Sequence, residues 1–172
     1  YSPSDAVTLA QRRPDCQVVF FAVGFETTAP ATALAVLQAA AAGLENFSLL
    51  TAHVRVQPAM ELLAGAADCR IDGFLAAGHV CTVTGFESYE LFVRQFRMPV
   101  VVTGFEPVDL LLGIRECLTL IDQRIPDVRN CYGRSVRREG NPAARRIGDE
   151  VYEPADSPWR GLGVIPQGGL EL

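Results

Sequence analysis

Residues 18–30 read VVFFAVGFETTAP, an unbroken apolar run that ends at Gly24 and leads into the start of a helix. The run does not alternate between apolar and polar residues, which is typical of a strand covered on both faces. Residues 99–106, PVVVTGFE, repeat the order of a buried strand, the tripeptide Gly-Phe-Glu and a helix. A third Gly-Phe-Glu occurs at residues 85–87 in a different context, and the repeated unit is so short that it indicates recurrent local geometry rather than duplication.

Strand and helix signals alternate along the first 125 residues. Helices are predicted over residues 2–12, 28–43, 58–66, 88–96 and 106–123, and strands over 18–23, 47–51, 73–76 and 100–103. Ser2 and Asp5 have the spacing of a capping box at the first helix. The alternation predicts right-handed crossovers between parallel strands. We therefore expect residues 1–125 to form an α/β, Rossmann-like three-layer domain with a mostly parallel sheet of about four or five strands.

The character of the chain changes at about Pro126, where it becomes polar and rich in arginine. A break at Gly140-Asn141-Pro142 predicts a helix, a turn and a second helix. The closing stretch from Trp159 to Leu172 is rich in glycine and proline, which favours loops with a single edge strand. Residues 126–172 are thus predicted to be a helical and irregular extension that packs on a neighbouring domain in the full-length protein.

Length, charge and cysteine content limit the class of protein. A chain of 172 residues with 49% hydrophobic composition can form one domain with a substantial core. The formal net charge of −5 argues against nucleic acid or an anionic membrane as a partner. No apolar stretch is long enough to cross a membrane, and the five cysteines are odd in number and widely spaced, which indicates free thiols. We expect a cytoplasmic protein whose partners are proteins or small molecules.

Ligands of open parallel sheets bind beyond the carboxyl ends of the strands, and this rule selects four segments. They are residues 24–28, His53, residues 78–81 and residues 104–106. His53 and His79, the two histidines of the chain, are therefore expected on one rim. His79 lies in a segment whose glycines would let the backbone approach a ligand closely. A ligand role for His79 stands beside the alternative of a structural histidine.

The other residues of these segments allow two interpretations each. His79 and Cys81 cannot complete a structural zinc site, which needs four ligands, and an isolated cysteine such as Cys81 is commonly a small buried hydrophobe. Glu26, Thr27 and Thr28 precede a helix N-terminus, which favours an anion but is also ordinary helix-start chemistry. The sequence contains no Gly-x-Gly-x-x-Gly, Gly-Lys-Ser/Thr, Gly-x-Ser-x-Gly or Cys-x-x-Cys pattern.

Several motifs in this order resemble those of the HypD family of hydrogenase maturation proteins. They are Gly24–Pro30 (Gly-Phe-Glu-Thr-Thr-x-Pro), Gly78–Val80 (the start of Gly-His-Val-Ser), Gly104–Asp109, Asn130–Asn141 and Trp159–Pro166. The resemblance covers essentially the whole chain. It implies the central α/β domain of that family, without the N-terminal cysteine motifs and the C-terminal iron–sulfur region. Cys81 departs from the pattern, because the family usually has serine there.

The resemblance implies a scaffold, rather than an enzyme, for assembly of the iron–cyanide–carbonyl centre of nickel–iron hydrogenases. It implies HypC and HypE as partners, and His79 as an iron ligand shared with an N-terminal Cys-Gly-Gly-His segment that is absent here. A 4Fe-4S cluster would be bound by C-terminal cysteines that are also absent. Glu26, Thr27 and Thr28 would line the interdomain cleft as candidate catalytic residues, and Cys81 could add a soft metal ligand. The isolated chain is expected to hold no metal firmly.

Two other classes of function fit the residues. A doubly wound small-molecule enzyme would bind an anionic substrate at Thr27 and Thr28, which binding of phosphate or nucleotides would reveal. A metal-free protein-interaction domain would instead dock a partner through the rim and the arginines that follow residue 129.

Overall fold

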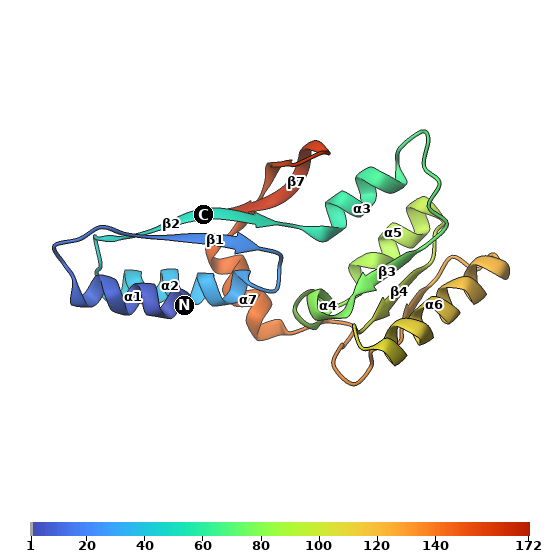
Figure 1. Ribbon diagram of the computed structural model, residues 1–172, viewed down its shortest axis with the longest axis horizontal. Coiled ribbons are helices and arrows are strands. Elements are labelled where there is room, and N and C mark those ends of the chain that lie inside the picture. The colour runs from blue at the N-terminus through green and yellow to red at the C-terminus, as the bar shows by residue number, and fades with distance from the viewer. Residues whose placement is uncertain (1) are drawn as a thin grey trace. The chain divides into compact units, whose positions relative to one another are not determined.

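The computed structural model describes residues 2–172, which divide into two compact units (Figure 1). Unit 1 contains the chain up to Pro58 together with Ala143–Leu172, and unit 2 contains Ala59–Pro142. Each unit has its own β-sheet. The helix α3 (Val56–Ala64) carries the chain out of unit 1, and α7 (Pro142–Val151) brings it back.

Unit 1 is built on a mixed four-stranded sheet in the order β1-β2-β7-β6. The strands are β1 (Val18–Gly24), β2 (Phe47–Val54), β6 (Glu153–Trp159) and β7 (Gly163–Glu171). β1 and β2 are parallel and are joined by α2 (Ala29–Ala41), whereas β7 is antiparallel to both β2 and β6. The first helix, α1 (Pro3–Arg12), begins with the predicted capping box, in which Ser2 and Asp5 accept hydrogen bonds from each other's backbone N–H groups.

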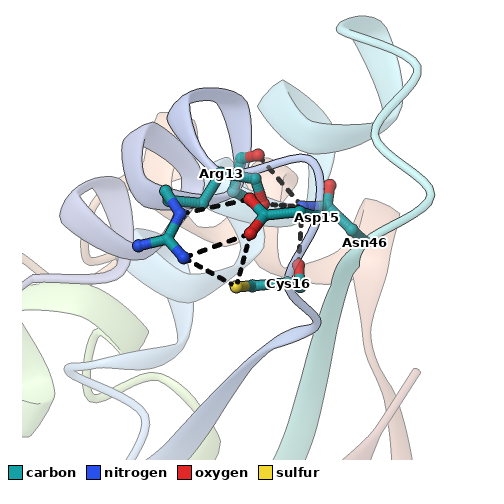
Figure 2. A network of polar contacts seen from close by, with 5 residues as sticks. Arg13, Asp15, Cys16 and Asn46 are labelled. Carbon is teal, nitrogen blue, oxygen red and sulfur yellow. Dashed lines mark hydrogen bonds and ion pairs between the residues drawn. The ribbon is translucent and has the colours of Figure 1, made fainter.

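Asn46 fastens the end of α1 to the start of β1 (Figure 2). Its side-chain amide donates to the carbonyl oxygens of Ala10, Arg13 and Cys16 at 2.9–3.0 Å. The last carbonyls of a helix have no partner within the helix, so these bonds satisfy groups that would otherwise be unpaired. Arg13 forms an ion pair with Asp15, and both contact the Cys16 thiol, whose pKa is raised chiefly by its hydrogen bond to Asp15. Cys16 thus belongs to a structural network.

Unit 2 is a three-layer domain around a parallel sheet in the order β3-β4-β5. The elements are β3 (Phe74–Ala77), α4 (Gly78–Thr84), α5 (Ser88–Phe96), β4 (Val100–Thr103), α6 (Pro107–Asp122) and β5 (Val128–Asn130). All four residues of the central strand β4 are buried. On one face Val101 packs against Cys117 and Leu120 of α6, and on the other Phe74 meets Phe92 of α5 edge to face.

The α/β, Rossmann-like class is confirmed, but the strands lie in two sheets instead of one of four or five strands. The reason is that β2 pairs with β7, which returns from the far end of the chain, while β3 pairs with β4. The two units also divide the chain differently from the expected segments 1–125 and 126–172. Packing of residues 126–172 on a neighbouring domain stays a prediction.

The C-terminal region corrects two expectations. The first helix expected after Pro126 does not form, because Val128–Asn130 extends the sheet of unit 2 as β5; the second helix is confirmed as α7. The glycine- and proline-rich end is a hairpin, and its strand β7 lies inside the sheet. Gly161 and Gly163 have the positive φ angles that the turn requires, and Pro166 lies where the β6–β7 register shifts, so it interrupts no regular ladder.

The expectation that β1 is covered on both faces is wrong for the described residues. Val18 and Ala22 are buried, but Val19, Phe21 and Val23, which point to the opposite face, are exposed. Among residues 2–172, no helix combines the length and apolar character needed to cross a bilayer.

Candidate functional site

The segments expected on one rim are divided between the two sheets. Residues 24–28 follow β1, and His53 lies in β2, so both belong to unit 1. His79 and residues 104–106 follow β3 and β4 in unit 2. The two histidines are therefore on different sheets, because β2 and β3 do not pair.

In unit 1, the Gly24–Thr28 segment is held by its own hydrogen bonds. Gly24 has φ 149°, and a Cβ atom there would lie 2.3 Å from the Thr28 hydroxyl oxygen, so only glycine fits. The Thr28 hydroxyl donates to the carbonyl of Phe25 and does not cap α2. One carboxylate oxygen of Glu26 accepts from the N–H of Val56 at 2.8 Å, while burial raises the pKa of Glu26. Glu26 is thus tied to the start of α3.

His53 lies in the interior of unit 1, with 1% of its surface exposed. Its ring meets the ring of Tyr152 edge to face at 5.4 Å, and the Tyr152 hydroxyl donates to Thr32 at 2.8 Å. Neither ring nitrogen of His53 has a hydrogen-bond partner among the described residues. Burial lowers the pKa of His53, since the charged imidazolium is poorly solvated there. His53 is therefore a neutral core residue.

This burial predicts that unit 1 loses stability as the pH falls below about 6.5. The unfolded chain takes up a proton at the ordinary histidine pKa of 6.5, whereas folded His53 does so only at lower pH. The contribution of neutral His53 to the free energy of unfolding is therefore complete above pH 6.5. It decreases as the pH falls from 6.5 toward the pKa of His53 in the folded protein. Urea unfolding between pH 5 and 8 measures it, with His53→Phe as the non-titrating control that keeps a ring beside Tyr152. Equal pH slopes in the two proteins would contradict the prediction.

In unit 2, His79 stands exposed in the first turn of α4, directly after β3. Its ring lies 4.9 Å from the ring of Phe105, which follows β4 and is itself exposed. The Thr82 hydroxyl donates to the carbonyl of His79 within the same helix. The short helix α4 was not predicted, since its run of valine and threonine disfavours helix. It places the His79 imidazole at an accessible position next to an aromatic ring.

Tyr132 fills the space that the glycines beside His79 provide. A Cβ atom at Gly78 would lie 2.5 Å from the Tyr132 ring, and one at Gly104 would lie 2.6 Å from it. The Tyr132 ring thus packs against the backbone at the ends of β3 and β4. The close approach to the backbone that Gly78 permits is therefore made by the Tyr132 ring.

Arg134 stabilises the region around Tyr132 through charged hydrogen bonds. Its guanidinium donates to both carboxylate oxygens of the buried Asp109 and, at 2.8 Å, to Glu106, and it lies 4.5 Å above the Tyr132 ring. These hydrogen bonds from Arg134 lower the pKa of Asp109 to about 2. Glu106 and Asp109 lie at the start of α6, so their hydrogen bonds to Arg134 fix the loop that carries Phe105. Sequence reasoning did not single out Asp109, Tyr132 or Arg134 as site residues, although they lie in the motifs 104–109 and 130–141.

The potential metal-donor atoms near α4 of unit 2 differ in their accessibility. His79 is exposed, whereas Cys81, two residues further along α4, is fully buried. Within residues 2–172, no group of three or more histidine, cysteine, aspartate or glutamate side chains could hold a metal ion. None of the cysteines in residues 2–172 forms a disulfide bond.

A family model described as HypD, hydrogenase formation hypA family, matches residues 1–172. The chain is 44% identical to hydrogenase maturation factor HypD of Escherichia coli (strain K12) over 176 residues and 43% identical to that of Rhodobacter capsulatus over 173 residues. It is 41% identical over 179 residues to hydrogenase maturation factor HypD2 of Bradyrhizobium diazoefficiens. Each match includes 100% of this chain but only 46–47% of the relative. The chain thus spans about half the length of these curated relatives.

Proposed function

Because this chain belongs to the HypD family of hydrogenase formation proteins, we propose that it is part of a scaffold on which the iron–cyanide–carbonyl centre of nickel–iron hydrogenases is assembled. Iron is the cargo in this proposal, and the chain contributes His79 as one of its ligands. The other ligands come from parts of the longer polypeptide outside residues 1–172. HypC and HypE as partners, a 4Fe-4S cluster outside this chain and a cytoplasmic location belong to the same proposal.

The observation that supports it is the exposed His79 at the end of a parallel strand of unit 2. Imidazole is a common iron ligand, and a histidine must be accessible and neutral to bind a metal. The Phe105 ring restricts the imidazole, and the Arg134–Asp109 pair holds the loop that carries Phe105. A ligand held in advance loses less conformational entropy when the metal binds.

The remaining candidates receive different roles. Glu26, Thr27 and Thr28 are proposed to line the cleft of the assembled scaffold; Glu26, whose pKa is raised, is suited to exchanging a proton there. Cys81 would have to leave the core to reach a metal, so we assign it to packing. An anion-binding enzyme site at Thr28 has less support, since the Thr28 hydroxyl is already bonded to Phe25.

The test is anaerobic titration of Fe²⁺ into a full-length polypeptide that contains this chain and, separately, into residues 1–172 alone. The full-length protein is expected to bind iron with a defined stoichiometry, and the isolated chain is expected to bind it at least about 100-fold more weakly, because a single imidazole leaves most coordination positions to water. Tight binding by the isolated chain would show a complete site within it. No binding by the full-length protein would contradict the scaffold proposal.

A further inference from the structure

The sheet of unit 1 has an apolar face that no described residue covers. Val19, Phe21 and Val23 of β1 and Leu50 of β2 have 57–63% of their surfaces exposed. The parallel register places Phe21 opposite Leu50 and Val23 opposite Ala52. Since alternate residues of a strand share a face, these side chains form one patch, which we call the open face.

The opposite face of the same two strands is a packed core. Figure 1 shows α1 and α2 together on one side of β1 and β2. Val18 and Ala22 of β1 are buried on that side, and Phe47 packs against a cluster of Val7, Ala35 and Ala39. The sequence of β1 is apolar at every position, so it suits a strand with helices on both sides.

The open face is unusually apolar for a surface that is exposed to solvent. Large contiguous apolar patches on soluble proteins mark contacts with other elements. β1 is also the terminal strand of its sheet, so one row of its backbone N–H and C=O groups has no strand beside it within residues 2–172. An apolar edge strand that has no charge, proline or covering element can readily pair with another strand. Both features point to missing structure on the β1 side.

The topology of the sheet indicates what that structure is. The crossover from β1 to the parallel strand β2 places α2 on the covered face, as the rule of right-handed crossovers requires for one direction along a sheet. In a doubly wound sheet, helices cover the second face where the crossovers run in the opposite direction along the sheet. In this sheet, that direction leads from β1 away from β2. The only free side in that direction is the outer edge of β1. The described chain contains no such crossover, whereas the curated relatives extend to about twice its length.

We propose that the open face is covered by helices of the same polypeptide, from the half of the longer relatives that lies outside residues 1–172, and that these helices connect parallel strands added at the free edge of β1. A second copy of the chain suits this face less well, because parallel sheets pack against helices and seldom against another sheet. The inference depends on the packing of unit 1 and is independent of iron binding.

The test is cysteine labelling of a full-length polypeptide that contains this chain, read at single positions by peptide mass spectrometry. Phe21→Cys is compared with Gln11→Cys, an exposed polar position on α1. Cysteine at position 21 is expected to react on the order of 100-fold more slowly than at position 11, at every protein concentration. In residues 1–172 alone the two positions are expected to react at similar rates.

Val23→Cys serves as a second variant, because valine and cysteine are similar in size and the substitution leaves the fold intact even where Phe21→Cys does not. Slow labelling at position 23 supports the proposal. Rapid labelling at position 23 in a folded full-length protein overturns it. Protection that appears only as the protein concentration rises would also overturn it, since a second copy would then be the cover.

Discussion

Replacement of Gly85 by alanine is expected to lower the free energy of unfolding of unit 2 by about 2–5 kcal/mol. Gly85 has φ 76°, and a Cβ atom there would lie 2.2 Å from the carbonyl oxygen of Arg138 and 2.7 Å from the nitrogen of Gly140. The obstructing atoms are backbone, so no rotamer change can relieve the contact. The two segments are also joined by hydrogen bonds from the N–H groups of Phe86 to Arg138 and of Asn141 to Val83.

The matched control for this substitution is Gly133→Ala. Nothing lies within 4 Å of a Cβ atom at Gly133, which is in the same unit. Its effect on the free energy of unfolding is expected to stay within about 1 kcal/mol. Urea unfolding followed by circular dichroism measures both variants. Equal stabilities of Gly85→Ala and Gly133→Ala would show that the 83–87 and 138–141 segments do not pack as described.

Replacement of His79 by alanine in a full-length polypeptide is expected to weaken iron binding strongly and to abolish hydrogenase maturation while leaving the fold intact. The imidazole is exposed and its ring contact is to Phe105, another exposed side chain, so its removal creates no cavity in the core. The loss of one ligand from a shared site is expected to weaken iron binding by at least about 100-fold. Anaerobic Fe²⁺ titration and a maturation assay measure the loss, and thermal unfolding checks the fold.

Thr82→Ala is the control for the His79 substitution. Thr82 lies one turn further along α4, and its hydroxyl donates to the carbonyl of His79 and to no other group among residues 2–172. Iron binding is therefore expected to persist in this variant. Normal iron binding by His79→Ala would make His79 structural and place the assembly site elsewhere. Loss of iron binding together with lowered thermal stability would mean that the variant acts through the fold.

The local elements could be predicted because their causes are local. The Ser2–Asp5 capping box, the helix Ser88–Phe96 and the strand Val100–Thr103 occur where hydrogen bonding between neighbours and the periodicity of apolar residues place them. The positions of Gly24 and Gly104 at the ends of strands follow in the same way. Where local signals conflict, as in the valine- and threonine-rich α4, the prediction failed.

The candidate site was only partly accessible to sequence reasoning. The position of His79 directly after a parallel strand could be foreseen, because that follows from the order of strands and helices. Its contact with Phe105 and the lock formed by Tyr132, Arg134 and Asp109 could not. Arg134 and Asp109 lie 25 positions apart in the chain, and no periodicity relates them.

The sequence by itself determined the α/β class, most helix and strand positions and the family, since each depends on residues close together in the chain or on motifs in a fixed order. Tertiary structure alone decided that β7 pairs with β2, that His53 is buried beside Tyr152 and that one face of β1 is open. The physical reason is that strand pairing and burial are set by competition among distant segments for the same edges and faces. A run such as VVFFAVG is compatible with one covered face or two, and only the elements that pack on it decide which.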